Sequence, residues 1–458
     1  MSSPPTAARS AGTCRPERPL READKPMTTS TVTETPHALP GPDDITRVEL
    51  ENGITVLVRE NFTSPAVVVN GVLRGGALQE SREQAGLAAF HSSLLTRGTV
   101  RHTFGELYEE IESNGASLDV VSGMHTYSFG SKSLSEDLPL MLGLLAEVIR
   151  EPTFPEEHVE KVRGQIITGL QMRAHSTRSM ASLAFYELAY PPDHPYSRSP
   201  EGYIETISRI TRDDIVAFHR NLGPRGAIFV IAGAVGAEEA VRLVEEAFGD
   251  WENPEQPDIP QAPPAPRLTE VRTRSVPIPG KAQTDIVLGY PGPPRSAPDF
   301  QAARMANSIL GVFGLYGRLG DSVREQQGLA YYSYSRLTGG LGPGPWRIIA
   351  GVAPSNVERA VESIRAEVRR LVEEPVTPEE LADNKSFFKG QLLLGLETNE
   401  GVAATLMTME LHQLGLDYLH RYRQIIDSIT AEDVQAAARH YLDPDAYALA
   451  VAGPEPSG

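Results

Sequence analysis

The fold assignment of this 458-residue chain starts from residues 86–99, which read Gly86-Leu87-Ala88-Ala89-Phe90-His91-Ser92-Ser93-Leu94-Leu95-Thr96-Arg97-Gly98-Thr99. Apolar residues at helical spacing predict a helix over Gln84–Leu95. Residues four apart share a helix face, so the side chains at 89 and 93 are neighbours.

The same segment resembles a helix of the zinc peptidases that carry the inverted motif H-x-x-E-H. The likeness lies in its Gly-Leu-Ala start, its Phe90 and its Arg-Gly-Thr end, and it places the three reactive positions on Ala89, Ser92 and Ser93. In the motif, histidines at the first and third positions hold one metal ion and the glutamate activates its water, and alanine and serine can do neither. The chain is therefore similar to the insulinase, pitrilysin and mitochondrial-processing-peptidase family of zinc metallopeptidases, from about Ile45 to Pro454.

Other landmarks of that family follow in the family's order. They are Phe154-Pro155-Glu156-Glu157, His194-Pro195-Tyr196, Gly202 and Ile210-Thr211-Arg212-Asp213-Asp214-Ile215. The family takes its last zinc ligand, a glutamate, from the helix after the Phe-Pro-Glu-Glu turn, and the resemblance places that position on Gly169. The three zinc ligands and the catalytic base of the family are thus all replaced in this chain.

A zinc site elsewhere in the chain finds little support. No H-x-x-E-H or H-E-x-x-H occurs among the 11 histidines. His91 projects from another side of its helix than 89 and 93, and we interpret it as a surface or packing residue because one imidazole is no zinc site. A stand-alone peptidase with an unrecognised metal site stays open as an alternative.

The second half keeps a segment that the family also has. Residues 323–331 end in Arg-Glu-Gln-Gln-Gly-Leu-Ala-Tyr and resemble the family's R-E-x-x-G-L-A-Y. In relatives this arginine and tyrosine reach the substrate backbone near the zinc, a role that the resemblance gives to Arg324 and Tyr331. A guanidinium suits carbonyl oxygens and a phenol can donate to an oxyanion. The alternative is an ordinary salt bridge for Arg324 and a buried strand position for Tyr331. The family's preceding glycine-rich loop is poorly matched at Gly311–Gly317.

Composition limits the class of protein. The length predicts two to four domains. The sequence has no run of about 18 apolar residues, so we expect no membrane-spanning helix. It also has no apolar core of a secretory signal near the start. We therefore expect a soluble, cytoplasmic protein. One cysteine, Cys14, excludes an intrachain disulfide. The net charge of −18 disfavours nucleic acid as a partner and favours basic or neutral polypeptides, although solubility alone also explains it.

The chain divides into four parts. Residues 1–44 are predicted to be a disordered tail, with Met27 as a possible true start, and 252–268 a Pro-rich linker between domains at 45–251 and 269–456. The two domains repeat each other: Ile207–Asp214 recurs as Ile426–Asp433, and Ala227–Gly233 as Tyr447–Gly453. Thr211 and Thr430 are predicted helix N-caps.

Strands and long helices interleave in both copies. Predicted strands are 54–59, 66–73, 117–121, 126–131, 282–290 and 346–352; predicted helices are 84–95, 104–114, 136–150, 156–173, 356–373 and 378–395. The first two strands are expected to meet across the turn at 61–65. The fold class is α+β with two homologous domains, each a mixed sheet with helices packed on one face. By resemblance this is a metallopeptidase half-shell, two of which enclose a peptide.

The functional hypothesis is a non-catalytic subunit of a heterodimeric zinc metallopeptidase, inactive alone. A homologous partner with an intact motif would supply the zinc, so we expect no cofactor in this chain, and the substrate would be a peptide. Arg324 and Tyr331 would act in trans. The alternative is a structural scaffold like the processing-peptidase-like core proteins of respiratory complexes.

Overall fold

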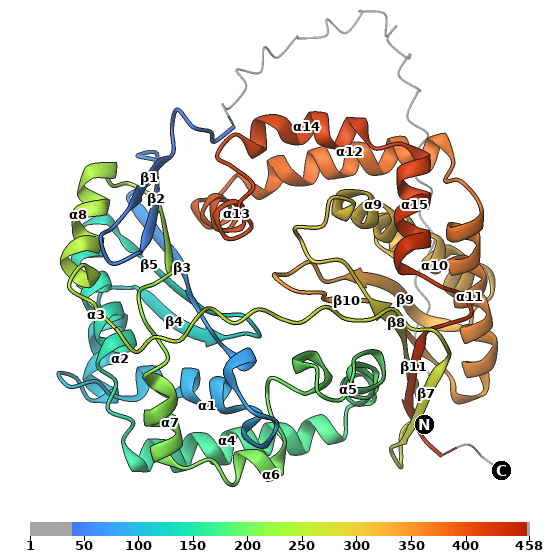
Figure 1. Cartoon of the computed structure of the whole chain (residues 1–458), viewed down its shortest axis with the longest axis horizontal. Coiled ribbons are helices and arrows are strands. Elements are labelled where there is room, and N and C mark those ends of the chain that lie inside the picture. The colour runs from blue at the N-terminus through green and yellow to red at the C-terminus, as the bar shows by residue number, and fades with distance from the viewer. Residues whose placement is uncertain (1–38, 456–458) are drawn as a thin grey trace, which may run out of the picture. The chain divides into compact units, whose positions relative to one another are not determined.

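The structure is a computed structural model that describes residues 39–455, and the chain from Pro40 onward forms one compact unit. The predictions for Cys14, Met27 and most of the 1–44 tail fall outside the described residues. Two mixed sheets form the framework (Figure 1). The α+β class predicted from the sequence is confirmed.

The N-terminal sheet has the order β1-β2-β6-β3-β5-β4. Its strands are β1 (Thr46–Glu49), β2 (Thr55–Glu60), β6 (Ile228–Gly233), β3 (Ala66–Arg74), β5 (Thr126–Leu134) and β4 (Ser117–Ser122). Because β6 pairs with β2 in parallel and with β3 antiparallel, the expectation that β2 and β3 meet across their turn is wrong. Every residue of β6 is buried, and a strand that is apolar on both faces is stable in the middle of a sheet.

The C-terminal sheet has the order β7-β11-β8-β10-β9. Its strands are β7 (Arg272–Pro277), β11 (Ala448–Gly453), β8 (Thr284–Pro291), β10 (Pro345–Val352) and β9 (Ala330–Leu337). Only the β7–β11 pair is parallel in this sheet. β6 and β11, which carry the repeated apolar sequence, thus each have a parallel and an antiparallel neighbour.

In each half the helices alternate along the chain with the strands of that half's sheet. The N-terminal set is α1 (Leu87–Leu94), α2 (Phe104–Ser113), α3 (Leu138–Arg150), α4 (Glu156–Ala174), α5 (Thr177–Ala189), α6 (Ile204–Ile207), α7 (Arg212–His219) and α8 (Ala237–Phe248). The C-terminal set is α9 (Phe300–Gly311), α10 (Phe313–Leu319), α11 (Val357–Glu373), α12 (Pro378–Gly395), α13 (Asn399–Leu411), α14 (Tyr418–Ser428) and α15 (Ala431–Tyr441). The hydroxyls of Thr211 and Thr430 accept from the amides of Asp214 and Asp433, which confirms both predicted N-caps.

The two halves exchange one helix each. Val67, Val69 and Leu73 lie on one face of the N-terminal sheet, and α3 and α8 pack on that face. α13, from the other half, lies against β6 and β3. Reciprocally, α5 packs on β11, β8 and β7, opposite the face covered by α9 and α11 (Figure 1). The predicted layer of helices on one face is present, and a helix from the other half partly covers the second face.

The segment 249–271 contains no helix or strand and runs from one half to the other (Figure 1). Gln256 is buried in it, accepts a hydrogen bond from the Arg225 amide (3.0 Å) and donates one to the Arg225 carbonyl (3.1 Å). The segment is therefore fastened to the N-terminal half along part of its length. The domain boundaries at 45–251, 252–268 and 269–456 stay a prediction.

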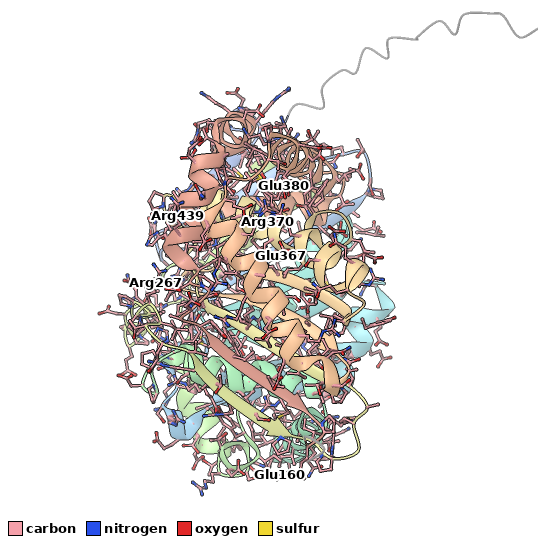
Figure 2. The ribbon with its side chains drawn as sticks, turned by 90° about the vertical axis from the view of Figure 1, so that its right-hand side faces the viewer. Glu160, Arg267, Glu367, Arg370, Glu380 and Arg439 are labelled. Carbon is pink, nitrogen blue, oxygen red and sulfur yellow. The ribbon has the colours of Figure 1, made fainter. Side chains whose placement is uncertain are left out.

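An ion pair fixes α10 to α12 near the retained Arg-Tyr segment. Arg318, which is 7% exposed, donates to both carboxylate oxygens of Glu380 (2.6 and 2.7 Å). Burial alone would raise the pKa of Glu380, but Arg318 and the capping bonds from Thr377 outweigh burial and lower it to about 2. Figure 2 shows Glu380 above α11, whose Glu367 and Arg370 form an ion pair at 3.6 Å.

Candidate functional site

The positions predicted to have lost zinc ligands lie on α1. The hydroxyls of Ser92 and Ser93 both donate to the carbonyl oxygen of Ala89, at 3.0 and 2.8 Å. Ser92 is buried, Ala89 is half-buried and Ser93 is exposed. Because both hydroxyls donate to a carbonyl oxygen of their own helix, they are not arranged to bind a metal ion.

Gly169 is on α4, which packs against α1 as the alignment requires. It is exposed, and a Cβ added there would meet nothing within 4 Å. The structure therefore brings the helices of all four predicted positions together. Zinc does not fit the residues present, because Ala89, Ser93 and Gly169 supply neither imidazole nor carboxylate. Among residues 39–455 no group of three His, Cys, Asp or Glu side chains is arranged to hold a metal ion.

A buried carboxyl holds the start of α1. Both oxygens of Glu80 accept backbone amides, from Gly86 at 3.0 Å and Ala88 at 2.5 Å, which satisfies two of the free donors of the first helical turn. Burial raises the pKa of Glu80 to about 7 against the opposing effect of these two bonds. The sequence analysis did not single out Glu80, whose distance from α1 along the chain is only a few residues.

His91 belongs to α1, and its side chain is fully buried. Its Nδ1 is 3.0 Å from the Tyr127 hydroxyl and its Nε2 is 3.0 Å from Nδ1 of His219. Burial, and then the neighbouring His219, lower the pKa of His91, and burial lowers that of His219 to about 4. Both imidazoles are therefore neutral at pH 7, and one donates to the other. Of the two predicted roles of His91, the packing role is therefore confirmed and the surface role is wrong.

Arg324 and Tyr331 lie in the C-terminal half. Arg324 belongs to the π-helical turn Gly320–Gln326, and Tyr331 is the second residue of β9. Tyr331 is 82% exposed, so the alternative of a buried aromatic is wrong. The Arg324 guanidinium lies 3.0 Å from the Glu325 carboxylate, and its side chain is 32% exposed. Within the described chain neither residue forms a hydrogen bond or ion pair with α1 or α4.

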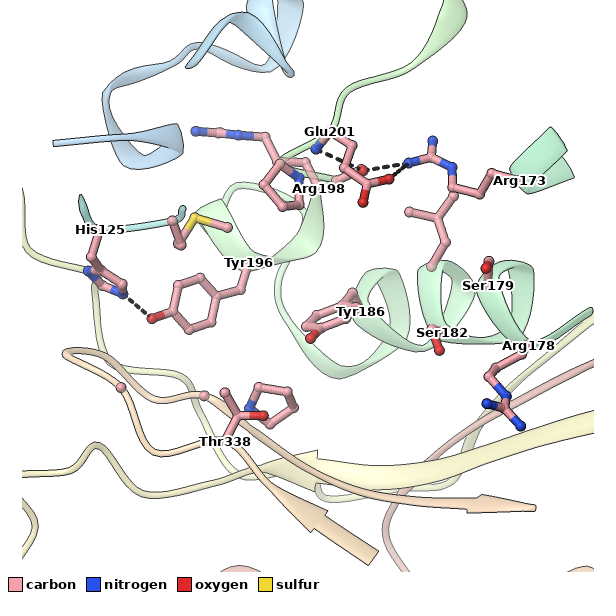
Figure 3. A pocket seen from close by; sticks show the side chains of 17 residues that line it. His125, Arg173, Arg178, Ser179, Ser182, Tyr186, Tyr196, Arg198, Glu201 and Thr338 are labelled. Atoms are coloured by element: carbon pink, nitrogen blue, oxygen red, sulfur yellow. Dashed lines mark hydrogen bonds and ion pairs between the residues drawn. The ribbon is translucent and has the colours of Figure 1, made fainter. Parts of the chain in front are cut away.

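A cavity of about 500 Å³ begins one helical turn after Gly169, at Arg173 near the end of α4. Figure 3 shows Arg173 reaching Glu201 (3.0 Å) on one wall, and His125 bonded to the Tyr196 hydroxyl on another. Burial lowers the pKa of His125 to about 4. α5 and the loop between β9 and β10 complete the walls, so residues from both halves meet here. These groups can contact a peptide, but no metal ligand set stands among them.

Comparison with known proteins agrees with this fold of two mixed sheets. The profile of insulinase, peptidase family M16, matches residues 55–190, and that of the peptidase M16 inactive domain matches residues 209–387. Together the two matches cover most of both sheet domains. The chain therefore belongs to the M16 (insulinase) family.

The relatives include an uncharacterised zinc protease of Mycobacterium leprae, 28% identical over 90% of this chain and 92% of that protein. The mitochondrial-processing peptidase subunit beta of Bos taurus is 25% identical over 88% of this chain and 83% of its own length. Among solved structures, a peptidase M16 inactive domain from Pseudomonas fluorescens superposes with a TM-score of 0.83 at 24% identity, covering 90% of this chain and 99% of that one. A Helicobacter pylori protease has a TM-score of 0.84 at 23% identity, with coverages of 91% and 100%. These structures show the fold.

No helix within residues 39–455 has both the length and the apolar character that crossing a bilayer requires.

Proposed function

We propose that this chain is the non-catalytic subunit of a two-chain zinc peptidase. A homologous partner with an intact H-x-x-E-H motif supplies the zinc and the base, and this chain supplies half of the peptide-binding chamber. The observation that carries the proposal is a contrast between two sites. The metal positions hold Ala89, Ser93 and Gly169, whereas the Arg-Tyr segment is retained with Tyr331 82% exposed.

The exposure of Tyr331 supports action in trans. A large aromatic side chain that is 82% exposed buries little area within its own chain, so its packing does not account for its presence. Its phenol can donate to the oxyanion that forms during peptide hydrolysis, and the forked guanidinium of Arg324 can bind a substrate carbonyl. Zinc belongs to the partner in this proposal, and a cytoplasmic location stays a prediction.

The test is peptide cleavage by the purified complex with the partner. Arg324→Ala or Tyr331→Phe is expected to lower turnover by roughly ten- to a thousandfold, the range for loss of one preorganised donor. Subunit association, measured by gel filtration, is expected to stay unchanged. Arg369→Ala on α11 is the matched control, because that arginine pairs with Asp445 on the surface.

Unchanged turnover in both variants of an intact complex would contradict the trans role. The scaffold function, without any contribution to hydrolysis, would then be the better account. Cleavage by the isolated chain that a chelator abolishes would contradict both, and would favour the stand-alone peptidase.

A further inference from the structure

A second cavity, of about 660 Å³, lies wholly within the C-terminal half. Residues of α9, α12, α13, α14 and the end of β9 line it. Its volume is in the range of sites that bind small molecules or peptide ends. Apolar and aromatic side chains form much of the lining, among them Leu337, Phe387, Leu392 and Met409. It shares no described lining residue with the cavity next to Gly169.

Two arginines line this cavity without a carboxylate partner. Arg295 donates to the Tyr418 hydroxyl (2.9 Å), and Arg304 to the Tyr422 hydroxyl (3.0 Å). Each guanidinium also lies over a phenylalanine ring, Arg295 at 4.6 Å and Arg304 at 4.3 Å from the ring centroids. Neither arginine forms an ion pair anywhere in the described chain, although the protein has 60 acidic and 42 basic residues. Donors on both guanidinium groups therefore remain for a ligand.

A buried hydroxyl in the same cavity also lacks a partner. Ser308, on α9 one turn after Arg304, lines the cavity, is 2% exposed, and its Oγ has no hydrogen bond within the described structure. The hydroxyls of Thr405 and Thr408, on the opposite wall, are satisfied by the carbonyls of Gly401 and Ala404. Leaving a buried hydroxyl unpaired is unfavourable, and an acceptor atom of a ligand would remove this cost.

The local charge has one sign. Burial is the first cause that lowers the pKa of His412 to about 4, and the positive charges of Arg295 and Arg74 lower it further. His412 is therefore neutral at pH 7 and does not compete with the arginines for an anion. No Asp or Glu is among the described residues that line the cavity. The cavity thus combines positively charged side chains with an apolar lining.

We propose that this cavity binds a carboxylate attached to an apolar group, with the carboxylate between Arg295, Arg304 and Ser308 and the apolar group on the aromatic lining. Guanidinium groups match the two oxygens of a carboxylate, and the bonds are strong because both partners are charged. Two sources carry this chemistry: the C-terminus of a peptide that ends in an apolar residue, and a free aliphatic acid. The site requires no partner subunit, so it does not depend on the proposed peptidase function.

The experiment measures binding to the full chain by calorimetry, with three probes. They are decanoate, a tetrapeptide Ala-Ala-Leu-Phe with a free C-terminal carboxylate, and the same tetrapeptide as its C-terminal amide. We expect at least one carboxylate probe to bind, and the amide to bind about tenfold more weakly or not at all. Binding of the tetrapeptide but not decanoate identifies a peptide terminus as the source, and the reverse identifies a free acid.

Variants test which groups bind. Arg304→Gln is expected to lower the affinity for the carboxylate probe by about 10- to 100-fold, and Ser308→Ala by about fivefold. Arg370→Gln, which removes an arginine on the outer side of α11, is the matched control and is expected to change nothing. Ser308→Ala also guards against misfolding, because removing an unpaired hydroxyl leaves the fold intact. Equal binding of acid and amide, binding of neither acid, or full affinity in both Arg304→Gln and Ser308→Ala would overturn the proposal.

Discussion

At Ala89, Ser92 and Ser93 the structure shows how little separates this helix from a metal site. Ser93 is exposed, and Gly169 faces open space on the adjacent α4. Longer side chains at 89, 93 and 169 thus meet few obstacles. Ser92 differs because it is buried, so a glutamate there would carry a desolvation cost. Restoring the ligands is therefore easier than restoring the base.

The unmodified chain is expected to bind no stoichiometric zinc after dialysis against the metal, because no ligand set is present. The triple variant Ala89→His, Ser93→His, Gly169→Glu is expected to bind about one equivalent, since α1 and α4 already pack together. Metal analysis of both proteins measures this. Ala89→His alone is the control, because one imidazole holds no zinc firmly. One tightly held zinc in the unmodified chain would refute the reading of a lost site, and a folded triple variant without zinc would show the alignment of α1 and α4 to be wrong.

Residue by residue, the sequence could predict what depends on the residue type and its neighbours along the chain. The caps Thr211 and Thr430 are predicted correctly because a cap needs only local spacing. For His91 the sequence leaves a surface and a packing role open, and only its burial in the structure decides for packing. The partners of His91, Tyr127 and His219, were not foreseeable because each belongs to a separate element. The roles of Arg324 and Tyr331 stay predictions, since they depend on a second chain.

Among the elements, α1 depends on a close backbone contact. Its first residue follows Gly86 in the left-handed region (φ 94°), and Gly202 (φ 76°) packs against it. A Cβ on Gly202 would lie 2.4 Å from the carbonyl oxygen of Ala85, a backbone atom that has no room to shift. This contact is a physical reason for glycine at 202, a position that the sequence analysis noted only as a landmark.

Gly202→Ala is accordingly expected to lower the free energy of unfolding by about 2 kcal/mol or more, from left-handed strain and the clash together. Gly169→Ala is the matched control. It adds the same methyl group to the interior of α4, where nothing is in the way, and is expected to raise stability by roughly 0.5–1 kcal/mol. Denaturant unfolding of both variants gives the comparison. A Gly202→Ala protein as stable as the unmodified chain would mean that the α1 contact is looser than described.

Local sequence patterns predict single strands but not the order in which strands pair in a sheet. The periodicity of residues 54–59 and 66–73 predicted two strands correctly, but not that β6, which is distant in sequence, lies between them. Strand formation depends on local alternation, whereas sheet order depends on which apolar strand gains most from burial on both faces. Residues 177–189 and 399–411 are not among the predicted helices, so the exchange of α5 and α13 between the halves is not predicted either.

For the whole molecule, that exchange makes each half incomplete alone. The apolar face of α5, with Ala181, Ala184 and Phe185, packs on Val287 and Ile349 of the other sheet. Polar contacts flank the exchanged helices: Arg47 pairs with Glu410 at 2.8 Å, and Thr177 donates to Asp285 at 2.6 Å. Separating the halves would expose these surfaces, so the molecule is expected to behave as one cooperative unit despite its two sheets.

A protease site inserted beside Gln261, an exposed residue in the extended segment 249–271, tests this expectation. After cleavage the two fragments are expected to elute together on gel filtration and to unfold in one transition, because the exchanged helices and not the connecting segment hold the halves. Phe185→Ala, which removes a fully buried ring from the shared cluster, is expected to cost about 3–5 kcal/mol and to release the fragments at lower denaturant concentration. Arg242→Ala, on the outer surface of α8, is the control and is expected to leave them associated. Fragments that separate on cleavage and melt independently would instead mean that each sheet is stable with its own helices, and that α5 and α13 contribute little to joining the halves.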